Sequence, residues 1–69
     1  MTIAGMKAFV AANASRLVTV KTTDLNYYYG KLAQNKAPNA FNLVQMEDNM
    51  GGRVVTILYD DCLYLTLGE

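Results

Sequence analysis

The sequence predicts a small α+β domain, in which helices cover one antiparallel sheet of three to four strands. Its 69 residues suffice for one compact domain, which we expect to span 1–69. A stretch near the N-terminus has apolar residues at helical spacing, and short β-branched and aromatic runs between turn residues fill much of the rest. We expect strands near 16–22, 41–47, 53–59 and 62–67, a helix over 3–13 and a second helix over 24–35.

The N-terminal helix is indicated by a cap and by a periodic face. The side chain of Thr2 can accept a hydrogen bond from a free N–H group of the first turn. The opposite side holds almost only alanine and glycine, which is unusual for a helix surface. Two interpretations stay open: alanine favours helix and tolerates water, or the small residues permit close approach of another element or a second chain. The periodic face consists of Ile3, Met6, Phe9, Val10 and Asn13.

The run from Arg16 to Thr22 is predicted to be an edge strand. Val18, Val20 and Thr22 share one face, while the other face ends in the polar side chain of Lys21. A lysine on an edge strand discourages pairing with other molecules. This partial alternation therefore suits a strand at the side of the sheet.

The segment 24–35 has features of both helix and strand. Three consecutive tyrosines favour a strand, and Gly30 would cost a helix interior about 1 kcal/mol relative to alanine. We nevertheless predict a helix, with a short strand over 25–29 and a turn at Gly30 as the alternative. Pro38 ends either element, because the residue before a proline avoids helical geometry. The residues that match the helical template are Leu25, Tyr28, Tyr29 and Leu32.

The stretch 53–67 is predicted to be a β-hairpin that turns at Asp60-Asp61 and continues an antiparallel meander begun by the strand over 41–47. Neither face of this hairpin is polar, whereas a sheet with one hydrated face alternates apolar and polar residues. We therefore expect the rest of the chain or a partner to cover both faces; which of them is the core stays open. One face would carry Val54, Thr56, Leu58, Leu63, Leu65 and Leu67, and the other Val55, Ile57, Tyr59, Cys62, Tyr64 and Thr66.

The residue types argue against an enzyme. The chain has no histidine, the commonest general acid or base and metal ligand, and its one cysteine, Cys62, has no histidine to activate it. We expect Cys62 to be a small buried hydrophobe in a reducing, cytoplasmic setting. We expect the acidic pairs Glu47-Asp48 and Asp60-Asp61 to lie in solvated turns. We expect no metal, no cofactor and, since no apolar run approaches about 20 residues, no membrane span.

The function predicted from these patterns is a small protein-binding module, an accessory or inhibitory factor of the kind that viruses and mobile elements encode. A homodimer would be one way to cover the apolar faces. Tyrosine combines a large contact area with a polar tip and is enriched at binding hot spots. The predicted partner-binding residues are Val55, Ile57, Tyr59, Tyr64, Tyr27, Tyr28 and Tyr29, although the hairpin members of this set would serve equally as core under a helix.

The alternative function is binding of nucleic acid by the tyrosines at 27–29. Aromatic side chains stack on bases, and Lys21, Lys31 and Lys36 lie nearby in the sequence. The net charge of zero weighs against this alternative, because phosphate binding demands positive charge. We therefore rank it below protein binding.

Overall fold

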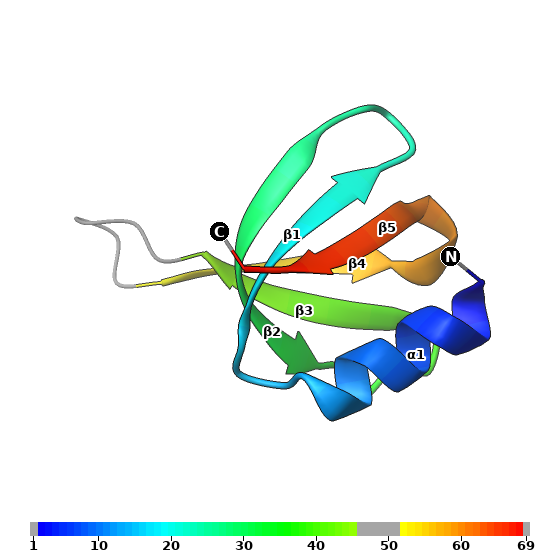
Figure 1. The fold of residues 1–69 in the computed structure, drawn as a ribbon, viewed down its shortest axis with the longest axis horizontal. Coiled ribbons are helices and arrows are strands. Elements are labelled where there is room, and N and C mark those ends of the chain that lie inside the picture. Colours follow the sequence, from blue (N-terminus) through cyan, green and yellow to red (C-terminus); the bar gives the residue numbers. More distant parts are fainter. Residues whose placement is uncertain (1, 46–51, 69) are drawn as a thin grey trace.

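The computed structural model describes residues 2–45 and 52–68 and confirms the α+β class. Five strands form one antiparallel sheet in the order β4-β3-β2-β1-β5, with one helix packed against it (Figure 1). The sheet thus has one strand more than expected. The elements are α1 (Ile3–Ala12), β1 (Leu17–Thr22), β2 (Tyr27–Gln34), β3 (Ala40–Gln45), β4 (Arg53–Leu58), the 3-10 turn η1 (Tyr59–Asp61) and β5 (Cys62–Leu67).

The N-terminal helix forms as its cap predicts. The N–H of Gly5 donates to Thr2 Oγ1 at 3.0 Å, and Asn13 closes the other end by donating to the carbonyl of Phe9. The helix buries Met6 and Val10 against β2, β5 and η1 (Figure 1). Within the described residues, no helix is long and apolar enough to cross a membrane.

Strand β2 bends the sheet because its two halves pair with different neighbours. Its residues 27–31 pair with β1, and its residues 31–34 pair with β3. Gly30 lies at the junction, where an added Cβ would sit 2.4 Å from the carbonyl oxygen of Val44. Only glycine allows the β3 backbone to approach so closely. The curl that follows brings one core together inside the sheet: Met6, Val10, Val18, Val20, Leu32, Phe41, Leu43, Ile57, Tyr59, Cys62 and Leu65.

The predicted helix over 24–35 is wrong, because this segment forms the strand β2. Tyr28 and Leu32 are four residues apart, a spacing that puts two residues on one face in a helix and in a strand alike. The deciding residues are Tyr27 and Tyr29, which are both exposed on the outer face, as a period of two requires. The alternative with a turn at Gly30 is also wrong, since β2 continues through it to Gln34.

The predicted hairpin over 53–67 is wrong as well. Both strands exist, but η1 carries the chain from β4 at one edge of the sheet to β5 at the other (Figure 1). A further register shift occurs where β5 pairs with Lys21 and Thr22 of β1. These two interruptions break the simple alternation, so the core takes residues from both predicted faces: Ile57, Tyr59, Cys62 and Leu65 are buried, whereas Val54, Leu58, Leu63 and Leu67 are exposed.

Of two smaller predictions, one is wrong and the other is confirmed. Strand β1 lies between β2 and β5 and is not an edge strand. The residue Cys62 is buried, as expected. The last part of the predicted strand 41–47 and the acidic pair Glu47-Asp48 lie outside the described residues.

Replacing Gly30 tests whether the close approach of β2 and β3 holds the curled sheet together. We expect Gly30→Ala to lower the free energy of unfolding by about 1–3 kcal/mol, because the new methyl group must displace backbone atoms. Urea denaturation followed by circular dichroism measures this. The neighbouring exposed substitution Lys31→Ala is the control and should change the stability by less than about 0.5 kcal/mol. Equal stability of Gly30→Ala and the wild type would contradict the role of this contact.

Candidate functional site

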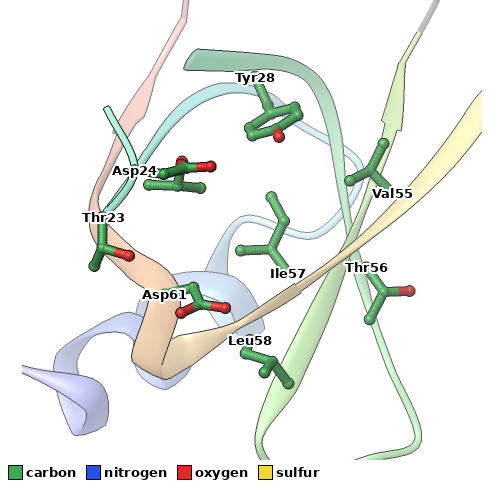
Figure 2. A pocket seen from close by; sticks show the side chains of 9 residues that line it. Thr23, Asp24, Tyr28, Val55, Thr56, Ile57, Leu58 and Asp61 are labelled. Atoms are coloured by element: carbon green, nitrogen blue, oxygen red, sulfur yellow. The ribbon is translucent and has the colours of Figure 1, made fainter. Parts of the chain in front are cut away.

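A cleft of about 370 Å³ runs along β4, on the side of this strand that faces away from β3 (Figure 2). Four consecutive β4 residues form one wall, and the turn between β1 and β2 forms the opposite wall together with η1. Ile57 and Tyr28 contribute apolar surface to the cleft, while the carboxylates of Asp24 and Asp61 line the far wall. The full lining comprises Thr22, Thr23, Asp24, Tyr28, Val55, Thr56, Ile57, Leu58 and Asp61.

The wall opposite β4 is held by hydrogen bonds within the turn. The N–H of Thr23 donates to the carbonyl of Asp61 at 2.8 Å, which ties the turn to η1. The hydroxyl of Thr22 donates to one carboxylate oxygen of Asp24, and the side chain of Asn26 donates to the other at 2.9 Å. The bond from Thr22 is the main cause that lowers the pKa of Asp24, so this carboxyl group stays ionised in mildly acidic solution.

Strand β4 presents its outer backbone groups to this cleft. The N–H of Tyr59 donates to the carbonyl of Asn39, one step beyond the β3–β4 ladder. In an antiparallel ladder, residues alternate between bonding the neighbouring strand and pointing away from it. The N–H and C=O groups of Val54, Thr56 and Leu58 therefore point away from β3. The structure describes no further strand on this side.

A second surface lies on the outer face of β2, β1 and β5. The ladders place Lys21 opposite Tyr27 on one side and opposite Tyr64 on the other, so the three residues form one row across the sheet. The Nζ atom of Lys21 lies 5.2 Å from the centre of the Tyr27 ring. A hydrogen bond with Tyr64 lowers the pKa of Tyr27, Lys21 lowers it further, and the same bond raises the pKa of Tyr64. The next row contains Tyr29, Thr19 and Thr66.

The predicted partner-binding residues fall into three places. Ile57 and Tyr59 are core residues, and Ile57 also lines the cleft; the ring centre of Tyr59 lies 5.2 Å from that of Phe41. Tyr28 and the partly buried Val55 line the cleft. The remaining three residues, Tyr27, Tyr29 and Tyr64, lie together on the outer face.

Sequence reasoning missed the far wall of the cleft, which Thr22, Thr23 and Asp24 supply, and it missed the open edge of β4. No short sequence motif indicates the far wall or the open edge, because both depend on which strands become neighbours in the sheet. The sequence places Lys21 near Tyr27 but gives no sign that Tyr64 lies on the other side of this lysine, since Tyr64 is distant from Lys21 in the chain.

No group of three or more potential metal ligands occurs among the described residues. Burial raises the pKa of the Cys62 thiol, which favours its unreactive protonated form.

Comparisons with protein-family models, with curated proteins and with solved structures found no significant match for this chain. The assignment of a function therefore depends on the cleft, the sheet edges and the outer face alone.

The hydrogen bond from Thr22 to Asp24 can be tested by titration. We expect the Asp24 carboxyl to titrate below its ordinary value of 3.8 and the midpoint to rise towards that value in Thr22→Val. Because the folded pKa is lowered, the stability that Asp24 contributes is present above the unfolded pKa and is lost as the pH falls through the folded pKa. Carboxyl-carbon NMR shifts measured against pH give the midpoints.

The control for this titration is Thr56→Val, which removes a hydroxyl from the other wall of the same cleft. It should leave the Asp24 midpoint where it is in the wild type. An Asp24 midpoint that Thr22→Val also fails to move would contradict the assignment.

Proposed function

We propose that this chain is a non-enzymatic protein-binding module that assembles with further copies of itself through the open edges of its sheet. The observation that carries the proposal is the strand order: β4 and β5 end the sheet, and each pairs with one strand only in the part of the chain that the structure describes. An open edge is a template for pairing with another chain, and monomeric proteins usually protect it.

Among the described residues, neither edge strand is protected by proline or by charge along its length. Strand β4, with the sequence RVVTIL, has one charged residue at its start, and β5, with the sequence CLYLTL, has none. Both strands also expose aliphatic side chains, namely Val54 and Leu58 on β4 and Leu63 and Leu67 on β5. Removing such side chains from water favours association by about 25 cal/mol per Å² of apolar surface. The edges therefore combine backbone groups that can pair with apolar surface that gains from burial.

The cleft beside β4 provides space for side chains of an added strand. In strand addition, backbone hydrogen bonds supply affinity, and alternate side chains of the new strand enter pockets beside the edge. The outer N–H and C=O groups of Val54, Thr56 and Leu58 would make these bonds. The cleft, about 370 Å³ in volume, would receive the side chains that point inward.

The second copy's β5 is the strand that fits this role. A two-fold dimer through β4 alone would leave the β5 edge of both copies open. Head-to-tail pairing of β4 with β5 of the next copy uses both edges, and it ends in a closed ring when the rotation between copies permits closure. This arrangement is the one that leaves no sheet edge exposed.

Leu58→Pro tests the β4 edge with little disturbance to the fold. The φ angle of Leu58 is -73°, close to the value that proline imposes, and its N–H points away from β3. We expect the wild type to sediment as an assembly larger than its chain mass of 7.6 kDa and the variant to sediment as a monomer with an unchanged circular dichroism spectrum.

Leu25→Lys is the matched control, because it also removes an exposed aliphatic side chain but lies in the turn before β2. It should assemble like the wild type. A wild-type protein that stays monomeric at high concentration would contradict self-assembly, as would a Leu58→Pro variant that assembles normally.

A mixing experiment separates head-to-tail pairing from a two-fold dimer. The double variant Leu63→Lys/Leu67→Lys alters only the β5 edge and should also be monomeric alone. Mixed with Leu58→Pro, it should form a dimer, because its intact β4 can accept the intact β5 of the other variant. In a two-fold dimer through β4, the β5 variant would instead assemble alone as well as the wild type does.

A further inference from the structure

We infer that the outer face of β2, β1 and β5 binds single-stranded nucleic acid by stacking bases on its tyrosines. This site is separate from the β4 cleft and does not depend on the assembly proposed above. It rests on three features of the face: exposed aromatic rings, a row of residues that alternates tyrosine and lysine, and positive charge with no acidic residue among the described members of its rows.

The tyrosines of this face are available to a ligand. Tyr27 is 60% exposed and Tyr29 is 43% exposed, although both belong to a central strand. They follow each other on one face of β2, so their separation along the strand is about 7 Å. Rings this exposed bury little apolar surface within the chain, and they offer two neighbouring platforms on which successive bases can stack.

Lysines lie beside both platforms. Lys21 lies between Tyr27 and Tyr64 in the row across the sheet, with its Nζ atom 5.2 Å from the Tyr27 ring centre. Lys31 is exposed on the same face, two residues beyond Tyr29. Ammonium groups next to stacking rings are suited to neutralise the phosphates that accompany stacked bases.

The charge of this face differs from that of the whole chain. The net charge is zero, but none of the described residues in these rows is acidic. Asp24, the nearest described acid along the chain, directs its carboxylate to Thr22 and Asn26. The described acids Asp60 and Asp61 lie in η1. A polyanion with planar bases therefore matches this face in both charge and shape, whereas an acidic protein would match its charge alone.

The binding expected from so few cations is weak but recognisable by its salt dependence. With two phosphates neutralised per chain, the logarithm of the binding constant should fall with the logarithm of the salt concentration with a slope of about −1.4. Lys21 should account for half of this slope.

The experiment is fluorescence anisotropy with a labelled oligo(U) of about 12 nucleotides, which lies within the site sizes of single-strand binders. We expect Tyr27→Ala and Tyr29→Ala each to weaken binding by about 5- to 100-fold, and Tyr27→Phe to keep most of the affinity because it keeps the ring. Lys21→Gln should reduce the salt slope by about 0.7. Circular dichroism of each variant confirms that the fold is kept.

Lys7→Gln is the matched control, because the Nζ atom of Lys7 also lies over a tyrosine ring, 5.8 Å from the centre of Tyr59, but that ring is buried. It should bind oligo(U) like the wild type. The inference is overturned if the wild type does not bind at low salt. It is equally overturned if the tyrosine variants bind as the wild type does, since the lysines would then act only as general charge, or if a duplex of the same length binds as tightly.

Discussion

The contact between the β2 backbone at Gly30 and the carbonyl of Val44 is the constraint on which the rest of this structure depends. It lets β2 pair with β1 along its first half and with β3 along its second half. The sheet therefore curls around one core instead of lying flat beneath two helices. Because it curls, a turn of three residues is enough to carry the chain from β4 at one edge to β5 at the other. The open edges, the cleft and the tyrosine face all follow from this geometry.

The sequence predicts well those features that depend on near neighbours. The N-terminal helix follows from the cap at Thr2 and the spacing of Met6 and Val10, and the strand over 62–67 matches β5. The burial of Cys62 also follows from its place at the start of the strand-like run over 62–67. In each of these cases, the residues that decide the structure are within a few positions of one another.

The wrong predictions arise where residues that are distant in the sequence determine the secondary structure or the strand pairing. Tyr28 and Leu32 satisfy helical and strand periods equally, and the strand wins because β1 and β3 pair with it on either side. Asp60-Asp61 resembles a hairpin turn locally, yet β5 pairs with β1 and not with β4. The candidate sites share this limit: the sequence predicts Tyr27 and Tyr29 as binding residues, but their placement beside Tyr64 depends on the strand order. The same holds for the separation of the core residues Ile57 and Tyr59 from the outer face.

The central claim is that the outer edge of β4 pairs with a strand of another copy. Hydrogen–deuterium exchange at two protein concentrations tests it most directly, because only pairing between molecules depends on concentration. The account predicts that the amides of Val54, Thr56 and Leu58, which point away from β3, become protected as the concentration rises. The amides of Val55 and Ile57, which bond β3 within the same chain, should be protected at both concentrations. Rapid exchange of the outward amides at every concentration would contradict the account.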